Sequence, residues 1–377
     1  MEILGGVNGL FGYLLPFLFV LLVVVFVHEL GHFAVARWCG VKVKAFSIGF
    51  GPELLSYVDK KGTRWRLAAI PLGGYVRFVD DLNPASAQTG EAAPEVSPED
   101  EDGRFQTKSL GARAAIVAAG PAANFLLAIL VFAVFFYSYG QTVHPPVVGR
   151  VIENSAAAQA GFEPGDLIVS IAGKPIEDFS DIQRVVSASA DETMTFVVDR
   201  AGRTLSLEAT PRWDEIEDGF GNKMRLGLLG IAREGTDDVV VKTFGPVEAL
   251  GAGVGQTWYI IERSLGYLFN VVRGTESADQ LGGPIRVAQI SGQMATLGFS
   301  ALVNLAAVMS VSIGLINLFP IPMLDGGHLM FYAYEALRGR PLSPRLQGVG
   351  LQIGMTIVLA MMIFATWNDI ARWVGVG

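Results

Sequence analysis

Long apolar runs are the feature that most constrains the fold of this chain. No charged side chain occurs between Glu2 and His28, and further apolar runs follow at 112–140, 299–319 and 351–367. A helix that crosses a bilayer needs about 20 predominantly apolar residues. The runs therefore predict a polytopic α-helical membrane protein with about four transmembrane helices.

The composition supports this class. Of the 377 residues, 51% are hydrophobic and 17% are charged, and the mean hydropathy is +0.42. Soluble domains carry about 25% charged residues. The net charge of −8, without a basic cluster, argues against a nucleic-acid binder, and the single Cys39 excludes an internal disulfide or a thiolate zinc cluster. The first apolar run has no preceding basic region and no cleavage pattern, so we expect a retained span rather than a signal peptide.

The segments between the runs predict β structure and soluble parts. "FSIGFGPELLSYV" and "WRLAAIPLGGYVRFV" alternate β-type residues with Gly and Pro, which predicts hairpins near the membrane. Residues 85–102 are acidic and lack aromatic residues, as in a flexible surface loop. Residues 245–273 are apolar but Gly-rich and flanked by charges, which favours an amphipathic helix on the membrane surface over a fifth span.

Residues 146–212 are predicted to form a compact soluble domain. A strand and turn at 146–155 precede a short helix that ends at Gly161, and a helix N-capped by Asp178 follows. A hairpin is expected around Ala201-Gly202. This order, with its A-x-x-A-G-F-x-x-G-D-x-I core, resembles a PDZ domain, and another small α+β module is the alternative.

Positive charges in the short loops predict the orientation of the spans. They concentrate after the first run and between the third and fourth runs. With four spans, both of these loops lie on the same side of the membrane, and the positive-inside rule makes that side cytoplasmic. Both termini and the PDZ-like domain then lie on the outer face, whereas a fifth span would put the second basic group outside. The two groups are Arg37, Lys42, Lys44, Lys60, Lys61, Arg64, Arg66 and Arg77, and Arg338, Arg340 and Arg345.

Three ionisable side chains interrupt the first run in the motif H-E-L-G-H, residues 28–32. Residues i and i+4 share one helix face, so His28 and His32 can bind one Zn²⁺, and Glu29, about 100° around the helix, can take a proton from the attacking water. The alternative is a pair of histidines satisfied by hydrogen bonds. An apolar span offers few such partners, and each ionisable group costs roughly 2.5–3.5 kcal/mol there. The motif therefore favours a zinc site.

A catalytic zinc site normally takes a third protein ligand and keeps one open position. We expect Asp325, because the helix-breaking Pro320 and Pro322 before it free backbone groups that must lie inside protein or beside a cavity. A turn aspartate is the alternative for Asp325. His328 is the competing ligand, for which a role beside the ligands is favoured, and His144 is expected in an outer linker.

The predicted depths of His28 and Asp325 in the bilayer agree. Helix rise places His28 about 13 Å from Arg37, the expected cytoplasmic boundary of the first span. Asp325 lies similarly near the boundary marked by Arg338. Both groups are therefore expected in the cytoplasmic half of the bilayer.

Three motifs together resemble the site-2 protease family of intramembrane zinc metalloproteases (peptidase family M50), with the greatest likeness to the bacterial regulator-of-sigma-E protease branch. They are H-E-L-G-H at 28–32, G-P-A-A-N at 120–124 and N-L-F-P-I-P-M-L-D-G-G at 317–327. The resemblance extends to "FSIGFGP", "IPLGGYV" and the PDZ-like insert. That branch typically carries two tandem PDZ domains, whereas residues 141–245 have room for one.

The resemblance implies site residues with named roles. Zn²⁺ would be bound by His28, His32 and Asp325, with Glu29 as catalytic base. Asn124 and Asn317 would lie near the site and hold substrate or polarise the reacting carbonyl; helix-kink partners or interhelical hydrogen bonds are the structural alternatives for these two asparagines.

The resemblance also implies a substrate and a location. The substrate would be a single-span membrane protein, such as an anti-sigma factor or a signal-peptide remnant, that another protease has already shortened on the outer side. "IPLGGYVRFV" would belong to a membrane-entering β element that presents an edge to an extended substrate. The protein would lie in the bacterial inner membrane, with its PDZ domain in the periplasm contacting substrate or gating access.

Two other functions remain open from the sequence. A membrane-anchored metalloprotease acting on soluble proteins would be expected to carry its motif outside a span or a Glu ligand on a following soluble helix, and neither is present. A catalytically silent PDZ scaffold or metal transporter would not need Glu29 between the histidines.

The sequence thus predicts eight consecutive segments. In order they are 1–40, the first transmembrane helix with the H-E-L-G-H motif; 41–111, a cytoplasmic-side loop with membrane-associated β hairpins; 112–140, the second transmembrane helix; 141–212, the periplasmic PDZ domain; 213–298, a periplasmic linker with amphipathic surface helices; 299–337, the third transmembrane segment; 338–348, a cytoplasmic loop; and 349–377, the fourth transmembrane helix.

Overall fold

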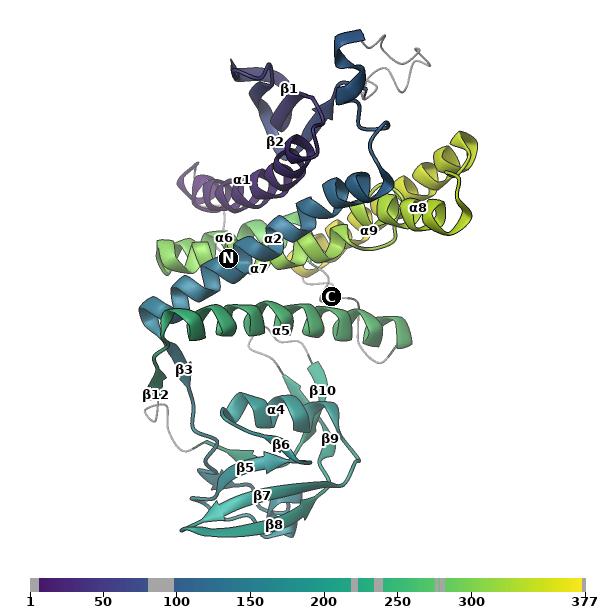
Figure 1. Ribbon diagram of the computed structural model, residues 1–377. Helices are drawn as coiled ribbons and strands as arrows, with labels where there is room; N and C mark the ends of the chain where they lie inside the picture. The colour runs from purple at the N-terminus through teal and green to yellow at the C-terminus, as the bar shows by residue number, and fades with distance from the viewer. Residues whose placement is uncertain are drawn as a thin grey trace. The chain divides into compact units, whose positions relative to one another are not determined.

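The chain divides into two compact units, which Figure 1 shows as ribbons. Unit 1 comprises Met1–Phe135 and Pro246–Gly377, and unit 2 comprises Phe136–Gly245. The computed structural model describes residues 7–80, 98–217, 223–233, 240–274, 278 and 282–374. Most of the predicted acidic surface loop at 85–102 lies outside the described residues.

Unit 1 contains the four apolar helices that the sequence predicts. Within the described residues, four helices are long and apolar enough to cross a membrane, and much of their apolar surface faces outward rather than into the chain. Outward-facing apolar side chains are what lipid contact requires. The helices are α1 (Val7–Trp38), α2 (Leu110–Tyr139), α7 (Phe299–Asn317) and α9 (Pro344–Val374).

Three further α-helices of unit 1 lie within the described residues. α5 (Pro246–Arg273) falls on the predicted amphipathic segment and is not among the four apolar helices. α6 (Pro284–Thr296) packs against α1, α7 and α9. The predicted segment 299–337 is broken at Pro320 and Pro322, as expected: α7 ends before these prolines and the chain resumes as α8 (Asp325–Arg338).

A β element follows α1, as predicted, and consists of β1 (Val43–Val58) and β2 (Arg64–Phe78), ahead of the short 3₁₀ helix η1 (Pro98–Gly103). The two strands pair antiparallel, and irregularities in register let Phe46 lie opposite both Trp65 and Val76. Phe46 is 1% exposed and contacts Phe33 of α1 edge to face, with ring centroids 5.5 Å apart. This aromatic contact buries one face of the β element on the helix that carries the H-E-L-G-H motif.

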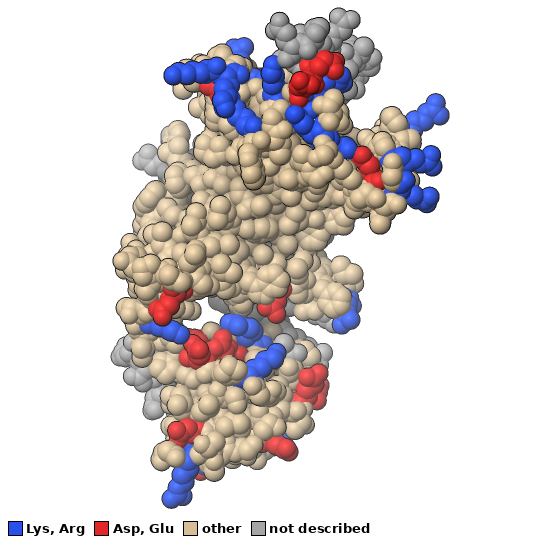
Figure 2. Space-filling view, in the orientation of Figure 1, with Lys and Arg blue, Asp and Glu red and all other residues tan. Residues whose placement is uncertain are grey.

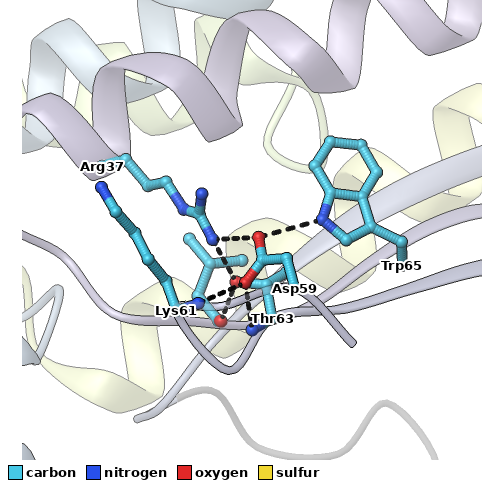
Figure 3. A network of polar contacts seen from close by, with 6 residues as sticks. Arg37, Asp59, Lys61, Thr63 and Trp65 are labelled. Atoms are coloured by element: carbon cyan, nitrogen blue, oxygen red, sulfur yellow. Dashed lines mark hydrogen bonds and ion pairs between the residues drawn. The ribbon is translucent and has the colours of Figure 1, made fainter. Parts of the chain in front are cut away.

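A polar network also joins the end of α1 to the turn between β1 and β2 (Figure 3). The carboxylate of Asp59 accepts hydrogen bonds from the Arg37 guanidinium, the indole N–H of Trp65 and the backbone N–H groups of Lys61 and Thr63. The Thr63 hydroxyl in turn donates to the carbonyl of Val43 over 2.6 Å. Partial burial alone would raise the pKa of Asp59, but these hydrogen bonds outweigh it and lower the pKa to about 2.

Unit 2 has its own hydrophobic core and a mixed α and β composition. A four-stranded antiparallel sheet has the order β6-β5-β7-β8, and its buried residues include Ile168, Phe196 and Val198. As predicted, α4 begins at an N-cap Asp178, which forms a reciprocal capping box with Asp181. The elements of the first part are β3 (Gln141–Val143), β4 (Arg150–Val151), α3 (Ala156–Ala160), β5 (Leu167–Ile171), β6 (Lys174–Pro175), α4 (Phe179–Ala188), β7 (Met194–Arg200) and β8 (Arg203–Ala209).

Unit 2 extends beyond the predicted boundary at 212. The start of the expected linker at 213–298 instead forms strands, and β11 pairs with β4 while β12 pairs with β3. Leu229, which is 3% exposed, joins the core of the unit. The linker prediction for this part is therefore wrong, because these apolar residues complete the sheet contacts that the first part leaves open. The strands are β9 (Arg212–Glu217), β10 (Lys223–Leu228), β11 (Ile231–Ala232) and β12 (Val240–Lys242).

Candidate metal centre

α1 presents the two histidines of the H-E-L-G-H motif on one face. The Nε2 atoms of His28 and His32 lie 3.2 Å apart, and the two rings meet nearly at right angles. Both residues lie in an apolar helix, and His28 is 9% exposed. The i, i+4 spacing thus brings two nitrogen atoms to one point, as the sequence predicts.

Asp325 reaches the same point from the break between α7 and α8. It is the first residue of α8, and Met323 just before it has a φ of +137°, which is strained for a residue with a side chain. The Oδ2 atom of Asp325 lies 3.2 Å from Nε2 of His28 and 3.5 Å from Nε2 of His32. The strained connection therefore delivers a carboxylate oxygen to the two imidazoles.

The three atoms fit one zinc ion. Bonds of about 2.0–2.2 Å in tetrahedral coordination put neighbouring ligand atoms about 3.3–3.6 Å apart. The three observed separations of 3.2, 3.2 and 3.5 Å are close to that range. Asp325 Oδ2 is also a buried acceptor without a hydrogen-bond partner, which is costly unless a cation satisfies it. Among the residues that the structure describes, this is the group of histidine, cysteine and acidic side chains suited to hold a metal ion.

Glu29 lies beside this triad and faces a cavity of about 370 Å³. The carboxylate of Glu29 accepts a hydrogen bond from the backbone N–H of Val76 on β2. Gly74 on the same strand packs so closely on the side chains of Val25 and Glu29 that an added Cβ atom would collide with them. The β element therefore forms one wall of the cavity, and the catalytic motif of α1 forms another.

The structure places the remaining histidines and asparagines of the sequence analysis at different positions. Asn317 and His328 line the cavity, and His328 is not one of the three residues that meet at the metal position. Asn124 is completely buried, with its Nδ2 atom 3.3 Å from Nδ1 of His28. His144 belongs to unit 2, where its backbone N–H donates to Asp178 over 2.7 Å.

Sequence reasoning missed two contributions from main-chain groups. The carbonyl oxygen of Ile116 on α2 lies 2.8 Å from Nδ1 of His32, and the backbone of Val76 contacts Glu29. A carbonyl or an N–H group has no residue-type signature. The available signals were indirect: Pro121, five residues after Ile116, and the Gly73-Gly74 pair, which ends two residues before Val76.

The structure thus combines an H-E-x-x-H helix, a carboxylate at the same point and four apolar helices, which is the arrangement of a membrane-embedded zinc metallopeptidase. The family model "Peptidase family M50" matches residues 16–361. This chain therefore belongs to peptidase family M50, the site-2 protease family, and is a zinc metalloprotease.

Relatives with similar descriptions match nearly full length. A "Putative zinc metalloprotease" of Agrobacterium fabrum is 51% identical over 375 residues, covering 99% of this chain and all of the relative. One of Rhizobium meliloti is 51% identical and covers 95% of this chain and 96% of the relative. The "Metalloprotease MmpA" of Caulobacter vibrioides is 40% identical, covering 96% of both chains. A solved PDZ domain from Listeria monocytogenes covers 25% of this chain and 87% of its own at 17% identity, with a TM-score of 0.18 that supports no conclusion about the fold.

Proposed function

We propose that this protein is a zinc-dependent intramembrane endopeptidase that hydrolyses peptide bonds within transmembrane segments of other proteins. The observation that carries the proposal is the convergence of His28, His32 and Asp325 beside Glu29, inside an apolar helix rather than on a soluble surface. An active site within the bilayer is useful only for a substrate that is also there.

In this proposal the three converging side chains hold Zn²⁺, which supplies Lewis-acid polarisation of the scissile carbonyl and a lowered pKa of the attacking water. Glu29 accepts the proton of the attacking water on its carboxylate and then delivers it to the leaving amide nitrogen. The Val76 N–H holds the Glu29 carboxylate toward the cavity during both transfers. Asn317, which lines the same cavity, contributes a side-chain amide to substrate binding or to the reacting carbonyl.

We also infer that the substrate binds as an extended strand on β2. A helical peptide bond is shielded and must unwind before water can attack it. On β2, Gly74 pairs with Ile48 of β1, and Tyr75 pairs with Ser47. Gly74 and Tyr75 also line the cavity. A substrate strand beside this part of β2 would pass next to Glu29.

The orientation follows from the basic residues of unit 1. In Figure 2 many of the Lys and Arg side chains of this unit gather over the β element and around α8 and the start of α9. The positive-inside rule makes that side cytoplasmic, so the site lies toward the cytoplasmic half of a bacterial inner membrane. Unit 2 then lies in the periplasm, where a PDZ-like domain contacts substrate or controls access.

The substrate class follows from this topology. A single-span protein already shortened on its outer side, such as an anti-sigma factor or a signal-peptide remnant, has little mass left to obstruct entry into the site. Cleavage releases a fragment into the cytoplasm, which is regulated intramembrane proteolysis.

The test compares the wild type with Glu29→Gln in proteoliposomes that hold a single-span substrate truncated on its outer side. We expect the wild type to cut within the substrate's membrane segment, located by mass spectrometry. The substitution should lower the rate by about 10²–10⁴-fold, because it removes the proton acceptor and leaves the metal ligands in place. Zinc content, measured in parallel, should be the same in both proteins.

Two results would contradict the proposal. Equal cleavage by wild type and Glu29→Gln would reject Glu29 as the base. A zinc-loaded wild type that cuts no membrane-embedded substrate, but cuts an unfolded soluble protein or nothing, would favour the anchored protease or the silent scaffold instead.

A further inference from the structure

The two histidine rings are held from behind by α2, at the atoms that face away from the metal position. Nδ1 of His32 lies 2.8 Å from the carbonyl oxygen of Ile116, and Nδ1 of His28 lies 3.3 Å from the carboxamide of Asn124. A metal-binding histidine almost always donates its second ring N–H to such a partner, which fixes the tautomer and the ring orientation. Both partners here belong to α2 and lie about two helical turns apart.

The sequence of α2 makes room for the two rings. At Gly120 an added Cβ atom would collide with the rings of both His28 and His32. Pro121, the next residue in the helix, lacks an N–H group and so leaves the carbonyl of Val117, four residues earlier, without its helical donor. Glycine thus allows the backbone of α2 to lie directly behind the imidazoles.

The Asn124 side chain is buried, unlike the side chain of a residue that contacts substrate. It is 0% exposed, while Ser310 of α7 donates a hydrogen bond of 3.0 Å to its backbone carbonyl and Gly314 lies against its Cβ. Its Oδ1 atom is a buried acceptor without a partner. When Nε2 of His28 binds the metal, the neutral ring carries its proton on Nδ1, and this N–H then needs an acceptor at Asn124. Rotation of the amide places Oδ1 at that position.

We propose that the segment Ile116–Asn124 of α2 is the support that orients the metal-binding histidines, with Asn124 as the positioning residue for His28. The proposal rests on the zinc site of the proposed function. It assigns Asn124 to the metal centre rather than to the substrate, because the Asn124 side chain can reach the chemistry only through His28.

The test measures zinc affinity instead of proteolysis. Asn124→Leu keeps the size of the side chain and removes the acceptor, whereas Asn124→Asp keeps an oxygen at the same position. Ser310→Ala is the matched control, since it disturbs the same contact of α2 with α7 without touching the carboxamide. For each full-length protein in detergent, the dissociation constant for Zn²⁺ is measured by chelator competition, and the absorption spectrum is recorded with Co²⁺ in place of zinc.

We expect Asn124→Leu to weaken zinc binding by about 10–100-fold and to change the Co²⁺ spectrum. Asn124→Asp and Ser310→Ala should bind zinc within a few-fold of the wild type. Equal affinity of a folded Asn124→Leu and the wild type would overturn the proposal, as would equal weakening in Ser310→Ala.

A second measurement covers the case in which Asn124→Leu does not fold. The chain has four histidines, so ¹⁵N spectra of histidine-labelled, zinc-loaded wild type can resolve the His28 ring. We expect zinc on Nε2 and a proton on Nδ1 that exchanges slowly with water; zinc on Nδ1, or rapid exchange of the Nδ1 proton, would overturn the proposal. If the wild type binds no zinc, the proposed function fails instead, so the two failures are distinguishable.

Discussion

Each of the two units contains an aspartate with at least one carboxylate oxygen shielded from solvent, and the surroundings of the two carboxylates differ. In unit 2, Asp166 is 0% exposed and receives two hydrogen bonds from Arg200, of 2.6 and 2.8 Å, and one from the backbone of Glu163. In unit 1, Asp325 Oδ2 is buried without a hydrogen-bond partner and lies beside two histidine nitrogens. The chain supplies hydrogen-bond donors to the first carboxylate, whereas the buried oxygen of the second faces two histidine nitrogens with which it would share a bound cation.

This difference separates structural from functional buried charges. A buried charge with a complete set of partners contributes to a specific fold, whereas one without partners costs stability that selection retains for another reason. The pKa of Asp166 fits the first case: burial would raise it, but the Arg200 guanidinium and the Glu163 N–H outweigh burial and hold it below its usual range. The unsatisfied oxygen of Asp325 marks the metal centre.

The largest expected effect is at Asp325. Asp325→Ala should lose bound zinc and reduce peptidase activity by at least about 10³-fold, since both metal retention and catalysis depend on the third ligand. Zinc content by mass spectrometry checks the first part. After chelator treatment, the free energy of unfolding of Asp325→Ala should equal or exceed that of metal-free wild type, because the substitution removes an unsatisfied acceptor.

His328→Ala is the matched control for Asp325→Ala. His328 lines the same cavity, but it is not among the three converging residues. The His328→Ala protein should therefore retain zinc at the wild-type level. Retention of zinc by Asp325→Ala together with its loss from His328→Ala would reverse the assignment of the third ligand.

A smaller effect of another kind is expected at Asp166. Asp166→Ala should destabilise unit 2 by about 2–4 kcal/mol, because it removes several hydrogen bonds and leaves the Arg200 guanidinium without its buried partner. Denaturant unfolding followed by limited proteolysis within 136–245 measures this change, and zinc content should not change. Glu163→Ala removes an exposed partner of Arg200 and should cost no more than about 1 kcal/mol. Equal effects of the two substitutions would contradict the distinction between buried and exposed pairs.

The smallest expected effect is the pH dependence at Asp59. Its folded-state pKa of about 2 lies below the unfolded value of about 3.9, so its stabilising contribution is present above pH 4 and is lost as the pH falls toward 2. The stability difference between wild type and Asp59→Asn should accordingly shrink between about pH 4 and pH 2. A difference that stays constant over this range would show that the Asp59 carboxylate is not paired in the folded state.

Much of unit 1 follows from local patterns. The four apolar helices, the break at Pro320 and Pro322, and the shared face of His28 and His32 each depend on residues close together in the chain. Helix periodicity and proline geometry determine such features without knowledge of the rest of the fold. The N-cap at Asp178 was predictable for the same reason.

The extent of unit 2 did not follow from such patterns. β11 pairs with β4, about 80 residues earlier in the chain, and the short strands from 212 onward carry no local signal for these partners. Strand pairing between distant segments depends on which sheet edges remain open after the rest has folded. Sequence patterns therefore predicted a linker where the structure has the last strands of a domain.

The sequence by itself determined the chemistry of this protein: an H-E-x-x-H pair in an apolar helix and a carboxylate after a proline-broken one point to a zinc peptidase in a membrane. Only the tertiary structure decided how that chemistry is supported. Ile116, Asn124 and Val76 act through a carbonyl, a buried amide and a main-chain N–H, each brought to the site from a distant segment. Side-chain types and spacing are written in the sequence, whereas the direction of a carbonyl or an N–H group exists only after the helices and strands have packed.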